Sequence, residues 1–127
     1  MTQEDKELLF KDLSARLPYH VKCKVWLEDG TTEEGLLDLQ HNYGNVLQDA
    51  FYYDKIKDIK PYLLPMSSMT EEQTEELKKL INTGQNDNNE FMRSLCRIDF
   101  YHKHHFDYRG LIPMGLAIDA TNLGIYE

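Results

Sequence analysis

Long apolar runs and an excess of positive charge are both missing from this chain of 127 residues. No stretch approaches the roughly 18 consecutive apolar residues of a membrane-spanning helix, and no basic start precedes an apolar run. The sequence therefore predicts neither a membrane segment nor export. The formal net charge is −8. Binding to nucleic acid or anionic lipid needs surplus Lys and Arg to displace counterions, so the composition disfavours both.

Cysteine is scarce as well, and Cys23 and Cys96 are too few for a disulfide framework. Both lie among apolar residues and are expected to be buried, which makes the cytoplasm the expected compartment. Phosphate-binding glycine loops, nucleophile elbows and zinc signatures are also missing from the sequence. These absences predict a protein that is not an enzyme and needs no cofactor. The length predicts a single domain over residues 1–127.

Strand periodicity is strongest in residues 21–62, which we expect to form an antiparallel meander. The pair Asp29-Gly30 predicts a two-residue hairpin turn, and a strand should start near Thr32. Gly35 is the expected site of a bend or bulge where the sheet curls. In this first hairpin the side chains expected to face the core are Val21, Cys23, Val25, Leu27, Leu37 and Leu39.

The second part of the meander has weaker strand patterns. Residues 41–45 predict a turn, residues 46–53 a third strand, and residues 55–60 a last strand. Pro61 is expected to end that strand, because proline cannot donate a hydrogen bond to a sheet. In the third strand Leu47, Phe51 and Tyr53 alternate with Gln48, Ala50 and Tyr52, and Ile56 and Ile59 mark the last strand.

The meander also resembles the first half of an Sm-like barrel motif. The residues that carry the likeness are Leu27, Asp29, Gly30, Gly35, Leu37, Asn45 and Val46. His41 stands where the motif usually has an acidic residue, and residues 53–64 show nothing like its second half with the Arg-Gly pair. The resemblance implies a small SH3-like or Sm-like partial barrel rather than RNA binding. An ordinary hairpin meander with glycine at its corners explains the same residues.

A helix is expected over residues 1–17. Thr2 with Asp5 resembles an N-cap followed by an acidic residue, and Pro18 stops the helix. Its apolar side is expected to consist of Leu9, Phe10, Leu13 and Leu17, and its polar side of Lys6, Lys11 and Asp12.

The second half, residues 70–127, is predicted to be helical with a docked tail. Residues 60–69 read as an extended connector, because Pro61 and Pro65 disfavour a central strand. Thr70 with Gln73 forms a capping box that starts a helix. The connector is expected to contact the core through Tyr62, Leu63, Leu64 and Met66, and the apolar stripe of the helix consists of Leu77, Leu80 and Ile81, with Gly84 as its cap.

Residues 85–89 lack apolar side chains and predict a mobile loop. A further helix is expected over residues 90–104, followed by a tail over residues 114–127 that docks on the core. The side chains of this helix expected to face the core are Phe91, Leu95, Cys96 and Ile98. The expected fold is therefore α+β: an N-terminal helix, a small curled antiparallel sheet or partial barrel, two helices and a docked C-terminal tail.

Four segments in two regions of the chain resemble a family of small proteins encoded by gut-dwelling bacteria and their integrated mobile elements, for which no activity is assigned. The likeness lies in the segments Ile59-Lys60-Pro61-Tyr62-Leu63, Pro65-Met66-Ser67-Ser68-Met69-Thr70-Glu71-Glu72, His104-His105-Phe106-Asp107-Tyr108-Arg109-Gly110-Leu111-Ile112 and Gly115-Leu116-Ala117. The resemblance implies a bacterial origin in a phage or mobile element. It assigns no cofactor and no catalytic residue.

The densest polar cluster lies at residues 102–107, where His102, His105 and Asp107 are candidate metal ligands. The alternative is that the histidines end a helix and that Asp107 caps the next turn. In the same segment Tyr108 and Arg109 form an aromatic-cation pair that suits a carboxylate or phosphate. Arg109 equally suits a bracing role, bonded to helix-end carbonyls or to Asp107.

The leading hypothesis is a protein-interaction module whose partner is another protein, since eight tyrosines in an acidic chain suit an amphipathic interface. The alternative is a nucleic-acid or nucleotide binder that uses the barrel face and its lysines. The candidate binding residues are Trp26, Asn45, Tyr52, Tyr53, Tyr108 and Arg109, and the lysines that would gather on the sheet are Lys22, Lys24, Lys55, Lys57 and Lys60. The sequence leaves the oligomeric state open.

Overall fold

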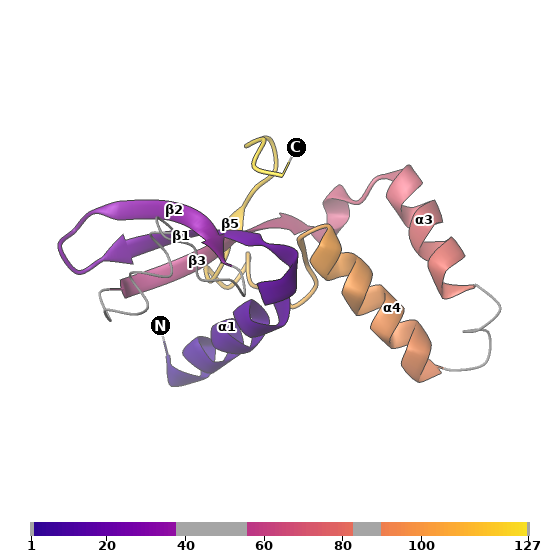
Figure 1. Cartoon of the computed structure of the whole chain (residues 1–127), viewed down its shortest axis with the longest axis horizontal. Helices are drawn as coiled ribbons and strands as arrows, with labels where there is room; N and C mark the ends of the chain where they lie inside the picture. Colours follow the sequence, from indigo (N-terminus) through magenta and orange to yellow (C-terminus); the bar gives the residue numbers. More distant parts are fainter. Residues whose placement is uncertain (1, 38–55, 83–89, 127) are drawn as a thin grey trace.

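The computed structural model describes residues 2–37, 56–82 and 90–126. An N-terminal helix packs against a small sheet, and two further helices lie side by side beyond one end of the sheet (Figure 1). The helical elements are α1 (Gln3–Arg16), η1 (Leu17–Tyr19), η2 (Met66–Ser68), α3 (Glu71–Ile81) and α4 (Glu90–Lys103). The strands are β1 (Val21–Leu27), β2 (Thr32–Leu37), β3 (Ile56–Pro65), β4 (Phe106–Asp107) and β5 (Ile118–Asp119).

The five strands form one mixed sheet in the order β2-β1-β3-β4, with β5 also paired to β3. β1 runs antiparallel to β2 and β3, whereas the short strands β4 and β5 run parallel to β3. The α+β class, the N-terminal helix and the docked tail are therefore confirmed. Within the described residues the sheet is open and not wholly antiparallel, because β4 and β5 add parallel partners that no alternation pattern marks in the sequence.

The hairpin between β1 and β2 has a three-residue turn, not the predicted two-residue turn. Leu27 N donates to Thr31 O at 2.9 Å, which leaves residues 28–30 as the turn. Gly30 has φ +90°, and Asp29 Oδ1 accepts from Thr31 N at 2.9 Å. A glycine in this left-handed region is the usual closing residue of three-residue hairpins. β2 still starts at Thr32, as predicted.

Gly35 is not a bulge. The register between β1 and β2 runs without a shift, and Gly35 simply faces Cys23. The irregularity in the sheet lies instead between Trp26 and Leu27, where β1 pairs with β3. The extra residue is Lys57 of β3, because Ile56 and Asp58 face the consecutive residues Leu27 and Trp26 of β1.

Pro61 does not end the last strand of the meander, because β3 continues through it to Pro65. Pairing between β1 and β3 stops at Pro61, which faces Cys23. From the next residue onwards β3 has a new partner, since Tyr62 faces Ile118 of β5. The proline therefore stands where the strand exchanges partners, and the expected connector is a central strand. Met66, expected to contact the core, is exposed.

The core lies where α1 covers β1 and β3. Its buried residues are Leu9, Leu13, Val21, Cys23, Val25, Leu63, Leu111, Leu116 and Ala117. The predicted inward face of β1 is thus confirmed, but Phe10 is 73% exposed and Asp12 is buried. Each helical residue turns by about 100°, so a stripe centred between Leu9 and Arg16 includes Asp12 and leaves Phe10 outside.

The helices α3 and α4 begin where predicted but pack less than predicted. Both halves of the capping box between Thr70 and Gln73 form. No side chain of α3 is buried, and α4 buries only Phe100 and His102 near its C-terminal end. The expectation that Phe91, Leu95 and Ile98 face the core is therefore wrong, because only the end of α4 reaches it (Figure 1).

Several expectations lie outside the described residues. They are the turn at residues 41–45, the strand at residues 46–53 with Leu47, Phe51 and Tyr53, the inward Leu39, the cap Gly84 and the loop at residues 85–89.

Candidate functional site

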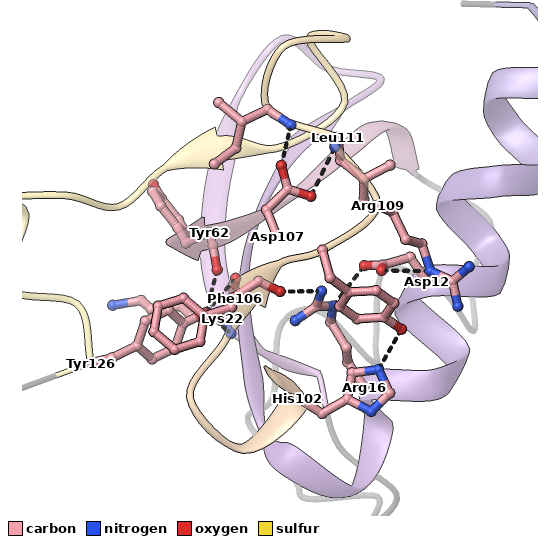
Figure 2. A network of polar contacts seen from close by, with 12 residues as sticks. Asp12, Arg16, Lys22, Tyr62, His102, Phe106, Asp107, Arg109, Leu111 and Tyr126 are labelled. Atoms are coloured by element: carbon pink, nitrogen blue, oxygen red, sulfur yellow. Dashed lines mark hydrogen bonds and ion pairs between the residues drawn. The ribbon is translucent and has the colours of Figure 1, made fainter. Parts of the chain in front are cut away.

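A network of ion pairs around the fully buried Asp12 joins α1 to the segment that follows α4. Asp12 Oδ2 accepts from Arg16 Nε at 2.7 Å, and Asp12 Oδ1 accepts from Arg109 Nε at 3.1 Å (Figure 2). Arg16 Nη2 donates to the carbonyl oxygen of Phe106 at 2.7 Å. Asp12 therefore holds two guanidinium groups, and the charged groups tie the first helix to β4 and the turn after it.

The aromatic-cation pair predicted at Tyr108 and Arg109 is part of this buried network. The Tyr108 ring lies 5.4 Å from Arg16 Cζ and 5.1 Å from Arg109 Cζ. Arg109 has the bracing role that the sequence suggested, but its partner is Asp12 and not Asp107. Both candidate binding residues thus contact the scaffold, and the charge of Arg109 is already matched by Asp12.

His102 links Tyr108 of the network to Tyr19 of η1. Its Nε2 lies 2.7 Å from the Tyr108 hydroxyl, and its ring lies 5.4 Å from the ring of Tyr19. Burial, together with the nearby Arg16, lowers the pKa of His102. The Tyr19 hydroxyl in turn donates to Asp99, which raises the pKa of Tyr19 to about 12. Two ring systems and one carboxylate therefore fix the C-terminal half of α4 against η1.

Asp107 holds the turn that follows β4. Its Oδ1 accepts from Leu111 N at 2.8 Å, and its Oδ2 accepts from Ile112 N at 2.9 Å. The side chain is buried, so both backbone N–H groups would otherwise lose water without compensation. The predicted capping role of Asp107 is confirmed.

His105 anchors the C-terminal tail. It has φ +62°, and its ring stacks on the Tyr126 ring at 3.7 Å between centroids with 12° between planes. The Tyr126 hydroxyl donates to Tyr62 O at 2.6 Å and accepts from Lys22 N at 2.9 Å. Burial, with the nearby Arg16, lowers the pKa of His105 to about 4. The last turn of the described chain is thus fastened to both β1 and β3.

The three candidate metal ligands have separate structural roles. His102 bonds Tyr108, His105 stacks on Tyr126, and both oxygens of Asp107 accept backbone N–H groups. In the part of the chain that the structure describes, no group of three or more His, Cys, Asp or Glu side chains is placed to hold a metal ion.

The folded state should lose stability as the pH falls from about 6.5 towards about 4. Between these values an unfolded chain protonates His105 and the folded chain does not, so protons favour unfolding. We expect His105→Asn, which accepts a positive φ, to reduce this loss by roughly 1–3 kcal/mol. Urea unfolding at pH 7 and pH 5 measures this difference in the free energy of unfolding. Because the pKa of His102 is also lowered, the variant should keep part of the pH dependence, with the same sign.

His20 provides the matched control, because it is an exposed histidine that also has a positive φ, +56°. His20→Asn should change the pH dependence much less than His105→Asn does, because the charge of His20 is the last of the causes that lower the pKa of His105. If the two variants change the pH dependence of stability equally, protonation of His105 does not cause the loss of stability.

Trp26 lies on the side of the sheet away from the inward-facing residues of β1. Lys24 and Lys60 face each other across β1 and β3, and their Nζ atoms lie 5.4 and 5.7 Å from the Trp26 ring centroid. Glu34 faces Lys24 on the other side, and Asp58 faces Trp26, so acidic groups flank the pair. The other proposed members of this surface, Asn45, Tyr52, Tyr53 and Lys55, lie outside the described residues.

The largest departure from the sequence predictions is the exposed apolar face of α4. Phe91, Leu95 and Ile98, here called the α4 stripe, are 70%, 45% and 39% exposed. Their spacing places them on one side of the helix. Large apolar side chains in one contiguous row on a surface typically mark an interaction site, in contrast to singly exposed residues such as Phe10.

The stripe leads into a hollow between α4 and η1. The hollow has a volume of about 420 Å³ and is lined by Tyr19, Leu95, Cys96, Ile98, Asp99 and His102. Its walls are held by the Tyr19–Asp99 and His102–Tyr108 contacts described above, so its shape depends on the buried network. Stripe and hollow together form a preformed apolar surface with a polar rim.

Comparisons of the chain with protein-family models, with curated proteins and with solved structures each found no match. No helix in the described ranges is long and apolar enough to cross a membrane.

The sequence reasoning missed Asp12 and Arg16 in the polar network and the outward direction of the α4 stripe. The spacing of Asp12 and Arg16, four residues apart on the side of Leu9 and Leu13, was an available signal for a buried pair. No comparable signal marked the stripe, because an apolar row on a helix fits a core and an interface equally well.

Proposed function

We propose that this chain is a small, non-enzymatic, cytoplasmic protein-interaction module and that it binds its partner through the α4 stripe and the adjoining hollow. The observation that carries this proposal is the exposure of three large apolar side chains in a row on a helix whose end is fixed to the core. The resemblance to small proteins of gut bacteria and their mobile elements suggests a phage or mobile-element origin.

The shape and charge of this surface support protein as the ligand. An aromatic and two aliphatic side chains form its centre, and Glu90, Arg97 and Asp99 lie at its margin. Protein interfaces have this organisation, with an apolar centre depleted in charge and a polar rim. The buried network keeps the surface in one conformation before binding, which lowers the entropy lost on association.

A photo-crosslinking amino acid at Phe91 should give covalent adducts with protein when the chain is expressed in bacterial cells. Phe10, 73% exposed on α1, provides the matched position, because it is equally accessible but isolated. We expect at least about tenfold more adduct at position 91 than at position 10, since a hot-spot aromatic is buried on binding. Equal yields at the two positions would contradict the proposal.

A second candidate function, binding of single-stranded nucleic acid, is supported by Trp26 with Lys24 and Lys60. An aromatic ring flanked by cations can stack on a base and neutralise phosphate. The flanking Glu34 and Asp58 and the net charge of −8 act against it. Retention on RNA or DNA that weakens with salt and is lost in Lys24→Glu, Lys60→Glu would favour this second function over the first.

A further inference from the structure

We propose that the end of the tail, from β5 to Tyr126, is a latch that detaches from the sheet when His105 binds a proton. This inference does not depend on the proposed function, because the latch contains no residue of the α4 stripe. Two attachments hold the latch in place. At one end β5 pairs with β3 and Ala120 N donates to Leu63 O at 2.8 Å, and at the other end Tyr126 contacts both β1 and β3. Residues 121–124 between these attachments are exposed.

The Tyr126 hydroxyl lies where β1 and β3 separate. Their pairing stops at Cys23 and Pro61, so the next facing residues are Lys22 and Tyr62. The hydroxyl accepts from Lys22 N at 2.9 Å and donates to Tyr62 O at 2.6 Å, and it thereby bridges the two strands (Figure 2). Detachment of the latch would therefore expose a backbone donor of one strand and a backbone acceptor of the other to water.

The ring of His105 occupies a position that favours its neutral form. It is stacked on the Tyr126 ring, and within the described residues its Nδ1 is buried and has no hydrogen-bond partner. A protonated imidazole carries N–H groups on both nitrogens, so protonation would leave a buried donor unpaired. From β3 the contact is to the main chain, because Leu64 N donates to His105 O at 2.8 Å. Protonation therefore favours a state in which the ring leaves the stack and reaches water.

The charged groups that act on His105 are cations. Burial is the largest cause of its lowered pKa, and the charges of Arg16 on α1, His104 after α4 and His20 before β1 add to it. From the tail the titratable neighbour is Tyr126, which stays neutral because burial raises the pKa of its hydroxyl. A proton on His105 therefore adds a charge of the same sign to this group, and detachment of the latch allows that charge to be hydrated.

Detachment should become more favourable as the pH falls below about 6.5. The pKa of His105 is about 4 with the latch docked and should rise towards its ordinary value of 6.5 when the latch leaves the ring exposed, so protons bind the detached form more tightly. If the ordinary value is reached, the equilibrium constant for detachment rises about 20-fold from pH 7 to pH 5. This is an upper limit, because a charged ring is also attracted to the face of Tyr126.

Native-state amide hydrogen exchange of the full chain, followed by NMR at pH 7 and pH 5, tests the proposal. The reporters are the N–H groups of Ala120 and Lys22, which lose their acceptors on detachment, and the reference is the buried N–H of Leu111. We expect the protection of both reporters to fall by about 5- to 20-fold from pH 7 to pH 5 and to stay below that of the reference at both values. Low urea should speed exchange at the reference and leave the reporters almost unchanged, because detachment exposes little surface.

Three variants separate the proton from the other contacts of the latch. His105→Asn should remove most of the fall in protection between pH 7 and pH 5, and His20→Asn should change it much less. Tyr126→Phe keeps the ring but loses the bonds of the hydroxyl, so Ala120 should lose about tenfold in protection at both pH values and keep the fall between them. Protection of the reference in each variant shows that the fold is kept. The proposal is overturned if the two reporters exchange only together with the reference, or if the fall survives in His105→Asn.

Discussion

Asp12→Ala should lower the free energy of unfolding by about 3–5 kcal/mol, the largest loss expected for one substitution in this protein. The change leaves Arg16, itself fully buried, without its carboxylate partner. Arg16 Nη2 keeps the carbonyl of Phe106, but within the described residues Nη1 has no hydrogen-bond partner that would offset the loss. Urea unfolding followed by the fluorescence of Trp26, the single tryptophan, measures the effect.

Two further variants separate the charge effect from the loss of a side chain. Glu7→Ala removes an exposed carboxylate from the same helix and should change stability by no more than about 0.5 kcal/mol. Replacing both charges, as Asp12→Leu with Arg16→Met, should cost less than Asp12→Ala alone, because no unpaired charge stays buried. A single variant that is no less stable than the double one would show that Arg16 finds another partner or water.

Asp107→Ala should cost about 2–4 kcal/mol, because two backbone N–H groups lose their acceptor in a buried turn. Leu111, one of the two donors, is fully buried, so water does not replace the carboxylate there. Asp107→Asn keeps one acceptor oxygen and should show a smaller loss. The measurement is again urea unfolding at neutral pH, with and without a metal chelator.

Asp119 is the matched control for this prediction. Its Oδ1 accepts from Thr121 N at 2.9 Å in a similar turn, but the side chain is exposed and water can replace it. Asp119→Ala should therefore cost about 0.5 kcal/mol. Equal losses for the two aspartates would contradict the role given to Asp107, and a loss that depends on the chelator would favour the metal-ligand hypothesis.

The sequence correctly predicted those features that depend on interactions between residues close together in the chain. The capping threonines Thr2 and Thr70 start their helices, alternation set the buried face of β1, and Asp107 caps its turn. Each of these features depends on residues within a few positions of one another. The α+β class followed from them, because helices and strands segregate along the chain.

The features that sequence did not predict depend on distant partners. β3 passes Pro61 only because β5 supplies hydrogen bonds from near the end of the chain, with Ala120 N donating to Leu63 O at 2.8 Å. The second oxygen of the buried Asp12 is matched by Arg109, which comes from across the fold. The sequence pattern of an apolar helix face such as the α4 stripe is the same whether the face packs on a core or binds a partner. Only the three-dimensional arrangement distinguishes the two.

The contacts of Arg16, Asp12 and Lys22 with residues after α4 join positions that are 90, 97 and 104 apart in sequence. A nascent chain emerging from the ribosome has the first helix and hairpin long before these partners are synthesised. Until then Asp12 and Arg16 lack these partners, and burying their charges in an apolar core is unfavourable. We therefore expect α1 not to pack stably on the sheet before the partners are present. Folding should therefore finish late and in one concerted step, at a rate limited by closing these long loops.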